Sequence, residues 1–313
     1  MRINRDKFLG QWGVLLLALL LLAGSITHNL YKSYTDILAG EQQRLLTQVR
    51  VVNANLQAQI QGTDRVLQDI CEDLAESSSK QWSQVISNRR LGVIVDAISG
   101  VRTILALDAE GVVRLSNWKQ VLGKNLSQRE YFQIALKNPD PAVLFVSPPF
   151  KTLFGAWGIN LVRVITDAQG GFAGIAVATL DPEYFKTLLT SVNYSPDMWS
   201  TLAHGDGVQF LMVPERKGQP GMNLAQPGAF FTRHMASGKR ENVLSGTVYS
   251  TGEKRLMAMY TIHPPGLGMD KPLVVAAGRN LTAVFQEWRR HALNQGITFG
   301  ILSLIAVLSL LGF

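Results

Sequence analysis

The residues with the most suggestive chemistry lie in one short stretch, Ser127-Gln128-Arg129-Glu130-Tyr131-Phe132. The planar guanidinium of Arg129 can bind a carboxylate through two parallel hydrogen bonds. Tyr131 carries a hydroxyl on an apolar ring and suits a pocket wall, while Phe132 can line the pocket or pack in the core. The alternative for Arg129 is a structural ion pair with Glu130 or with a nearby aspartate.

Further candidates for the same ligand site lie downstream. Asp181 directly precedes a proline, a common helix start, so its carboxylate can cap a helix and can still contact a ligand. Ser147, Trp157 and Asn160 belong to or flank expected strands and are candidates for the cavity lining. Trp118 is expected to contribute less.

Enzyme signatures are missing from the sequence. It contains no G-x-S-x-G, H-E-x-x-H, phosphate-binding G-x-x-x-x-G-K or C-x-x-C motif. The five histidines never recur at three- or four-residue spacing, which argues against a helical metal site. The single cysteine, Cys71, excludes an intrachain disulfide and a thiolate cluster. We therefore expect no catalytic residue, no metal and no cofactor, and an enzyme of the cell envelope is the weakest alternative.

Two apolar segments frame the chain, at residues 8–27 and 296–313. The first contains a charge-free run of roughly 19 residues, about the length that crosses a bilayer as a helix. A cleaved signal peptide is the alternative, but the run is long for that role. The second segment is also uncharged, and we expect the chain to be cut within or just after this crossing.

Charge predicts the orientation. Three basic residues precede the first segment, Arg2, Arg5 and Lys7. Positive flanks stay in the cytoplasm, so residues 27–295 are expected outside it. The net charge of +7 comes from scattered residues without a run of five or more, so no nucleic acid partner is expected. A basic outer surface near anionic membrane lipid is the simpler interpretation.

Residues 28–98 are expected to be helical. From Leu38 to Leu74 apolar residues recur at steps of three, four or seven, which predicts one long amphipathic helix over 30–77. Part of this stripe can pair with a second copy of the chain, so a homodimer is expected. Another part can pack on the domain's own sheet, and both roles are expected along the one helix. A shorter helix is predicted over 81–97.

Two modules of strands follow. The first module, residues 99–195, is expected to be an antiparallel sheet with its helices on one side. A helix over 128–137 is inserted between the second and third strands. The strands are expected at 101–108, 112–116, 143–147, 158–166 and 172–180. After a helix over 182–190, the second module, residues 196–282, has its strands at 208–213, 242–249, 255–263 and 273–277. A linking helix, 283–295, then leads into the second span.

Three stretches resemble the double Cache (PAS-like) extracytoplasmic sensor domain of bacterial chemoreceptors, sensor histidine kinases and diguanylate cyclases. Residues 123–132 look like the family's G-x-x-L-S-x-R-x-Y-F, and residues 145–149 resemble its strand ending in Ser-x-Pro. Residues 167–174, with Leu180-Asp181, are similar to its D-x-x-G-x-x-G and L-D ending. The resemblance covers roughly residues 30–295.

The resemblance implies an α+β fold in which a long N-terminal helix carries two tandem PAS-like modules, flanked by two transmembrane helices. It also implies a ligand pocket in the membrane-distal module, where Arg129 matches the family's arginine and Asp181 its terminal aspartate. Tyr131 and Phe132 stand where family members have Trp and Tyr. The implied ligand is a small organic molecule, with a carboxylate or an amino acid both open.

The expected function is therefore small-molecule sensing outside the cytoplasm and signalling across the bacterial inner membrane. The chain would be the non-enzymatic input half of a sensor histidine kinase or a diguanylate cyclase. The alternatives are a chemoreceptor input domain, or a structural or protein-binding ectodomain without a small-molecule ligand.

Overall fold

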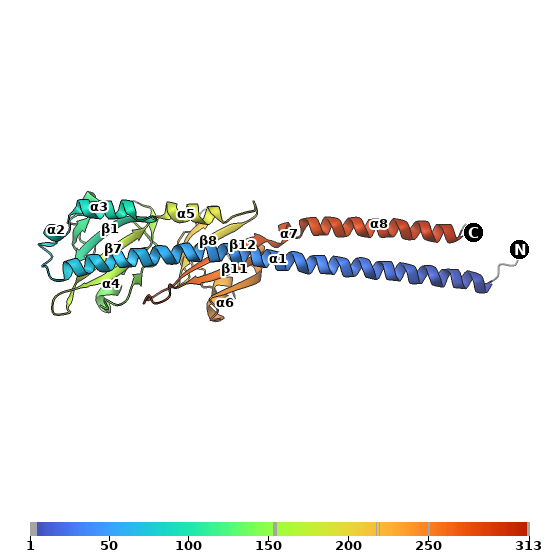
Figure 1. The fold of residues 1–313 in the computed structure, drawn as a ribbon, viewed down its shortest axis with the longest axis horizontal. Helices are drawn as coiled ribbons and strands as arrows, with labels where there is room; N and C mark the ends of the chain where they lie inside the picture. The colour runs from blue at the N-terminus through green and yellow to red at the C-terminus, as the bar shows by residue number, and fades with distance from the viewer. Residues whose placement is uncertain (1–4, 153–154, 217, 219, 250, 312–313) are drawn as a thin grey trace. The chain divides into compact units, whose positions relative to one another are not determined.

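The computed structural model describes residues 5–152, 155–216, 218, 220–249 and 251–311, and the chain divides into two units (Figure 1). One unit comprises the residues up to 44 and from 280 onward, and the other comprises residues 45–279. We call the second one the sensor unit, after the family that the sequence resembles. Helix α1 (Arg5–Ala75) supplies residues to both. Arg2 and the last two positions of the second expected span lie outside the described residues.

The first unit contains two helices with the length and composition of membrane spans, the beginning of α1 and α8 (Gln286–Leu311), which follows the short α7 (Leu281–Val284). An aromatic cluster joins them. The Tyr34 ring stacks on Phe285 with 4.4 Å between centroids, and the Trp288 indole N–H donates to the Leu30 carbonyl at 3.0 Å. These contacts hold α1 against the start of α8.

Within the sensor unit, α1 buries the apolar stripe that the spacing predicted. Leu45, Leu56 and Leu67 are at most 1% exposed. The helix expected over 81–97 is instead two helices, α2 (Trp82–Val85) and α3 (Asn88–Ala97). They separate because the chain is extended at residues 86–87, and the Ser87 hydroxyl accepts from the Arg90 N–H to cap α3.

The first module contains the five expected strands, in the order β2-β1-β7-β6-β3. Their bounds are β1 Val101–Asp108, β2 Val113–Ser116, β3 Phe145–Val146, β6 Asn160–Thr166 and β7 Phe172–Leu180. A separate hairpin joins β4 (Phe150–Lys151) and β5 (Trp157–Gly158). Gly111, at φ +78°, makes the β1–β2 turn, where a Cβ would come within 2.6 Å of Ser127.

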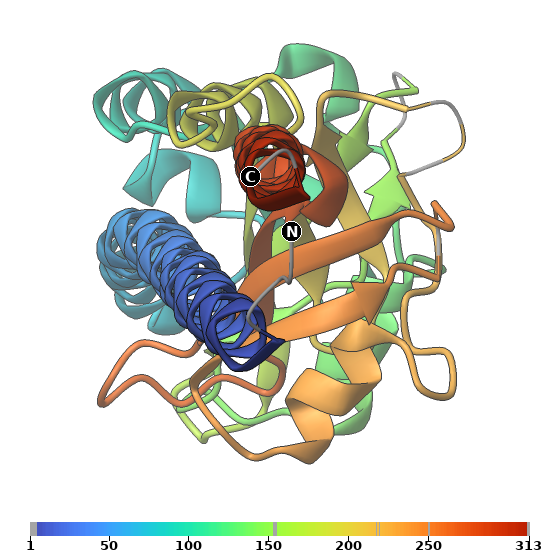
Figure 2. The same cartoon turned by 90° about the vertical axis from the view of Figure 1, so that its right-hand side faces the viewer.

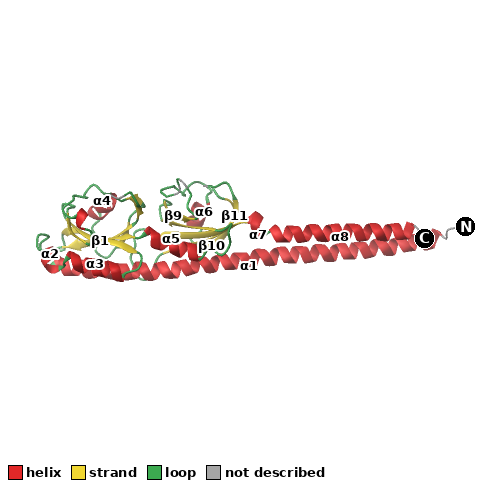
Figure 3. Ribbon diagram, turned by 90° about the horizontal axis from the view of Figure 1, so that it is seen from above, coloured by secondary structure: helices red, strands yellow, loops and turns green. Residues whose placement is uncertain are grey.

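Helices cover both faces of this sheet rather than one, which corrects the expectation. α1 and α3 lie on one side and α4 (Glu130–Lys137) on the other (Figure 3). The reason is visible in the strands. All residues of β1 except Arg102 are buried, so the sheet needs cover on each face.

The second sheet has the order β10-β11-β12-β8-β9. Its strands are β8 Trp199–His204, β9 Gln209–Val213, β10 Glu241–Thr247, β11 Lys254–Ile262 and β12 Leu273–Asn280. Counted within its own module, each sheet has the same strand order, 2-1-5-4-3. Helix α5 (Pro182–Ser191) lies on the side of α1 and α3, and α6 (Phe230–Ala236) on the opposite side (Figures 2 and 3).

Strand β8 was missed in the sequence because its residues alternate too little in polarity. All six of its residues are buried, including Ser200, Thr201 and His204. The Ser200 hydroxyl donates to the Leu189 carbonyl at 3.1 Å, which compensates for its burial. In the sequence alone, a polar residue such as Ser200 suggests an exposed loop, because its hydrogen-bond partner in the folded chain is not apparent.

The two modules of the sensor unit are joined beside β3. The Val146 N–H donates to the Asp270 carboxylate at 2.8 Å, and Leu144 forms a parallel bridge with Met269. The His204 Nε2–H donates to the Val146 carbonyl at 3.1 Å. The segment before β12 and the end of β8 therefore both bind the edge of the first sheet.

His204 is expected to make the free energy of unfolding depend on pH. Burial holds the pKa of His204 below its ordinary 6.5, a direction that nearby Lys271 supports and that Asp206, the Val146 carbonyl and Asp270 oppose. The unfolded chain then binds more protons, so this contribution to stability is present above pH 6.5 and is lost as the pH falls through the folded-state pKa. Urea unfolding from about pH 8 to 5 should show the loss, at most about 1.4 kcal/mol per pH unit.

The matched variant is His204→Gln, which keeps hydrogen-bonding groups but does not titrate. Burial also lowers the pKa of His234, with the same sign, so the difference between the two proteins isolates His204. Burial raises the pKa of Asp270, which opposes the loss as the pH falls toward 3.8. Identical pH profiles for the two proteins would contradict the prediction.

Candidate functional site

A row of polar side chains crosses three neighbouring strands of the first sheet. Thr103 on β1 pairs with Thr179 on β7, and Thr179 pairs with Asn160 on β6. The Thr179 hydroxyl donates to the Asn160 side-chain oxygen at 2.8 Å. All three are at most 9% exposed, on the face that carries α4. They form a polar floor in an otherwise apolar core.

The start of α4 places Arg129 and Tyr131 above this floor. Arg129 is the residue before the helix, and Tyr131 lies in its first turn, with its ring centroid 5.6 Å from that of Phe150. Burial raises the pKa of Tyr131 to about 12, although the Arg129 charge acts in the opposite direction. The phenol is therefore neutral at pH 7 and can donate a hydrogen bond.

Arg129 is half-buried, and its guanidinium is available for an anion. It lies 6.0 Å from the centroid of the Phe150 ring and donates one long hydrogen bond, 3.4 Å, to the Lys151 carbonyl. Within the described ranges, no carboxylate lies within ion-pair distance of it. The sequence offered a structural ion pair between Arg129 and Glu130 as the alternative. The described residues do not form that ion pair.

A second arginine, Arg102, lines the same cavity and was missed in the sequence. Strand alternation would put it on the opposite face from Thr103. The register between β1 and β7 shifts between Val101 and Thr103, however, and such a bulge re-aims a side chain. The Arg102 guanidinium lies 5.1 Å from the centroid of the Trp118 ring, which also lines the cavity despite the lower expectation for it.

These side chains enclose a cavity of about 60 Å³. Thr152 belongs to the lining, and its hydroxyl is buried with no hydrogen-bond partner among the described residues. Two guanidinium groups, a neutral phenol and the polar floor can together bind a small anion with a polar tail. The lining comprises Arg102, Thr103, Leu105, Trp118, Val121, Leu126, Arg129, Tyr131, Phe150, Thr152, Asn160 and Thr179.

Of the seven candidates, Arg129, Tyr131 and Asn160 line this cavity, and the others lie elsewhere. Phe132 is 1% exposed and packs edge-to-face on Phe172, with 5.9 Å between centroids. The Ser147 hydroxyl accepts from the Asn160 backbone N–H at 2.9 Å and so joins β3 to β6. Phe132 therefore packs in the core and Ser147 connects two strands, and neither residue lines the cavity.

Trp157 and Asp181 have structural contacts of their own. The Trp157 ring lies beneath the Lys151 ammonium, 5.9 Å from its centroid, and packs against Gly221 of the second module. The Asp181 carboxylate accepts from the Glu183 N–H at 3.2 Å and caps α5, as the sequence allowed. No acidic residue is among the described residues that line the cavity.

Comparison with known proteins finds the fold but no named family. No family model matches the chain, and no curated protein matches it. Among solved structures, the extracellular domain of the candidate histidine kinase rpHK1S-Z16 is similar, with a TM-score of 0.67 and 23% identity over 79% of this chain and 98% of that one.

Two chemoreceptor domains are similar as well. The periplasmic sensory domain of Campylobacter jejuni Tlp1 gives a TM-score of 0.55 at 16% identity, over 82% of this chain and 98% of that one. The ligand-binding domain of Pseudomonas fluorescens CtaA, in complex with L-isoleucine, gives 0.56 at 13%, over 81% and 96%. The sensor unit has the fold of extracytoplasmic sensory domains, and the resemblance to Cache-type sensors is confirmed at the level of the fold.

Proposed function

We propose that this chain is the input half of a membrane receptor and that its first module binds a small carboxylate outside the cytoplasm. The observation that carries the proposal is the pair of arginines, Arg102 and Arg129. Both line one cavity, and within the described ranges neither has a carboxylate within ion-pair distance. Both guanidinium groups are half-buried, so each has lost part of its hydration, and an anionic ligand is the natural partner.

The cavity favours a carboxylate without an ammonium group. The described lining includes no aspartate or glutamate that could bind an ammonium, and Asp181 caps a helix instead. The polar floor suits a hydroxyl or carbonyl on the same ligand. An amino acid, such as the isoleucine bound by CtaA, is the competing ligand class.

Three features of the chain support a role in signalling across a membrane. The two sheets share one strand order, which supports tandem PAS-like modules. Strand β12 continues directly into α7 and α8, so a change in the sensor unit can reach the second span along the chain. The two apolar helices support insertion in the bacterial inner membrane, with lipid around them.

We further propose that the receptor is a homodimer paired through α1 and that its output is a histidine kinase or a diguanylate cyclase. A chemoreceptor output is compatible with the same fold. A ligand can shift such a receptor only through different affinities for its two signalling states.

The test is isothermal titration of the whole chain in lipid nanodiscs with a panel of C2–C6 carboxylates and amino acids. Arg129→Ala should weaken the best binder by about 10- to 100-fold, because a hydrogen bond to a charged group contributes about 1.5–3 kcal/mol. Arg129→Lys should be intermediate, since it keeps the charge and loses the fork.

The matched control is Lys137→Ala, an exposed cation at the end of the same helix, which should leave the affinity unchanged. Tighter binding of amino acids than of the matching carboxylates would refute the ligand class proposed above. If no compound binds, or if both variants weaken binding equally, the structural ectodomain becomes the better interpretation.

A further inference from the structure

The second module contains a cavity at the position that corresponds to the carboxylate site. Its lining includes Phe230 and Phe231 of α6, as the lining of the first cavity includes Tyr131 of α4. Its volume is about 50 Å³, which is room for a molecule of about three to five heavy atoms. Tyr249, which is 63% exposed, lines it and marks its connection to the surface.

The chemistry of this second cavity differs from that of the first. None of its described lining residues is charged, and most are apolar, among them Met212, Met257, Met259 and Phe230. A carboxylate placed there would lose its hydration without gaining a cation. The cavity therefore favours an uncharged ligand.

Two buried polar atoms in this lining have no hydrogen-bond partner among the described residues, the Trp199 indole N–H and the Gln209 side-chain oxygen. Trp199 is 4% exposed and Gln209 2%. Leaving such groups unsatisfied costs about 1–3 kcal/mol each, so their presence in one cavity needs an explanation.

The orientation of the Gln209 amide follows from its neighbour. The Thr201 hydroxyl donates to the Leu211 carbonyl at 2.8 Å, so toward Gln209 it can only accept. The Gln209 NH₂ donates to it at 2.7 Å, which leaves the amide oxygen as an acceptor for the cavity. The cavity thus presents one donor and one acceptor, and one hydroxyl or one primary amide can satisfy both.

We propose that the second module binds a small uncharged molecule that carries a hydroxyl or a carboxamide on a short apolar body. Its oxygen accepts from the Trp199 indole, and its O–H or N–H donates to Gln209. The receptor would then read two chemically different ligands, one in each module. This second site does not depend on the carboxylate site.

The test uses the whole chain in nanodiscs, with its six tryptophans labelled with ¹⁵N at the indole nitrogen and Trp199→Phe to assign the resonance. Propan-1-ol and propionamide are the probes, and sodium propionate is the charged control. Either uncharged probe should shift the Trp199 indole resonance in a saturable way, and propionate should not. Arg129→Ala should leave this response unchanged, which separates it from the carboxylate site.

Two variants complete the test. Gln209→Met keeps the side-chain volume and removes the acceptor, so it should weaken binding about five-fold. Met259→Phe reduces the cavity without touching either polar atom and should abolish the response. A cavity occupied by water alone, with no saturable shift from either uncharged probe, would overturn the proposal, as would equal responses to propionate and propionamide.

Discussion

Asp64→Asn is expected to lower the free energy of unfolding of the sensor unit by about 3–5 kcal/mol, the largest effect among these predictions. The Asp64 carboxylate on α1 accepts from the Arg163 Nε–H on β6 at 2.6 Å, and the two side chains are 5% and 3% exposed. Arg163 also donates to the Pro141 carbonyl at 2.7 Å. Removing the negative charge leaves a guanidinium buried without its counterion.

Urea unfolding of the whole chain at pH 7 measures this effect. Asp69→Asn, an exposed position on the same helix, is the matched control and should change the free energy by less than about 0.5 kcal/mol. The double variant Asp64→Leu with Arg163→Met should be more stable than Asp64→Asn, because it removes both buried charges. A cost below about 1 kcal/mol for Asp64→Asn would show that the pair does not hold α1 on the sheet.

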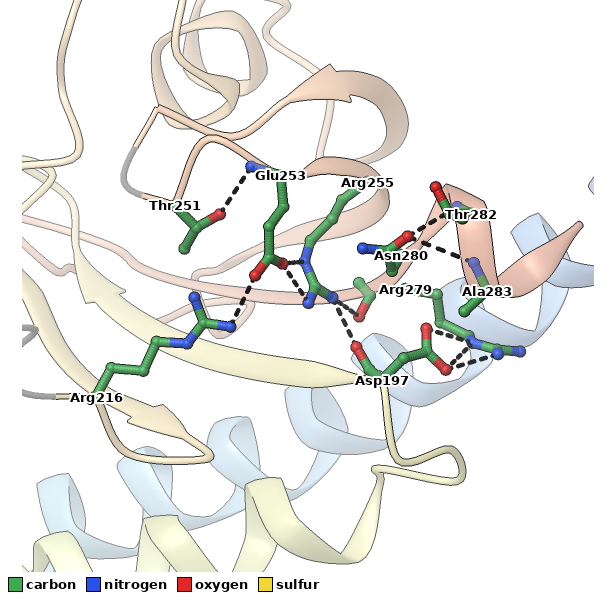
Figure 4. Close-up of polar contacts among 10 residues, drawn as sticks. Asp197, Arg216, Thr251, Glu253, Arg255, Arg279, Asn280, Thr282 and Ala283 are labelled. Atoms are coloured by element: carbon green, nitrogen blue, oxygen red, sulfur yellow. Dashed lines mark hydrogen bonds and ion pairs between the residues drawn. The ribbon is translucent and has the colours of Figure 1, made fainter. Parts of the chain in front are cut away.

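Arg255→Met is expected to cost about 3 kcal/mol. Arg255 is 4% exposed, and its guanidinium connects three segments (Figure 4). It donates to the Glu253 carboxylate at 2.6 Å, to the Asp197 carbonyl at 2.8 Å and to the Gly278 carbonyl at 3.2 Å. Burial lowers the pKa of Arg255, and Glu253 opposes that shift. Methionine keeps the aliphatic volume but leaves these acceptors without the donor.

The control for this prediction is Lys254→Met, the adjacent exposed cation on the same strand. Thermal unfolding of the two variants should differ, with only Arg255→Met lowering the midpoint by several degrees. Equal midpoints would mean that water replaces the guanidinium at no cost. Because Arg255 also lies 5.0 Å from the centroid of the Trp199 ring, the variant should shift the Trp199 indole resonance as well.

Local patterns in the sequence were sufficient for most of the elements. The spacing of Leu45, Leu56 and Leu67 predicted the buried stripe of α1, and the five strands of the first module lie where they were expected. Such features depend on neighbours within a few residues, which periodicity reports directly. Strand β8 and the short helix α6 were missed because neither shows a regular alternation of apolar and polar residues. Both residue faces of β8 are buried, so the strand has no exposed polar face.

The candidate ligand site was only partly predictable. Arg129 and Tyr131 were predicted because both belong to one short sequence stretch at the start of α4. Their role in binding a ligand stays a prediction. Arg102 was not found, since a bulge in the pairing of β1 with β7 decides where its side chain points. Strand register depends on the partner strand, so it cannot be predicted from the sequence of one strand alone.

By itself, the sequence determined the two apolar ends, the amphipathic α1, the alternation of strands and turns, and the arginine at the start of α4, because each of these depends on residues close along the chain. The tertiary structure alone decided which side chains meet: two arginines over one polar floor, Asp64 against Arg163, and an indole and an amide in a second cavity. Those residues are brought together by sheet register and helix packing, which join positions far apart in the sequence.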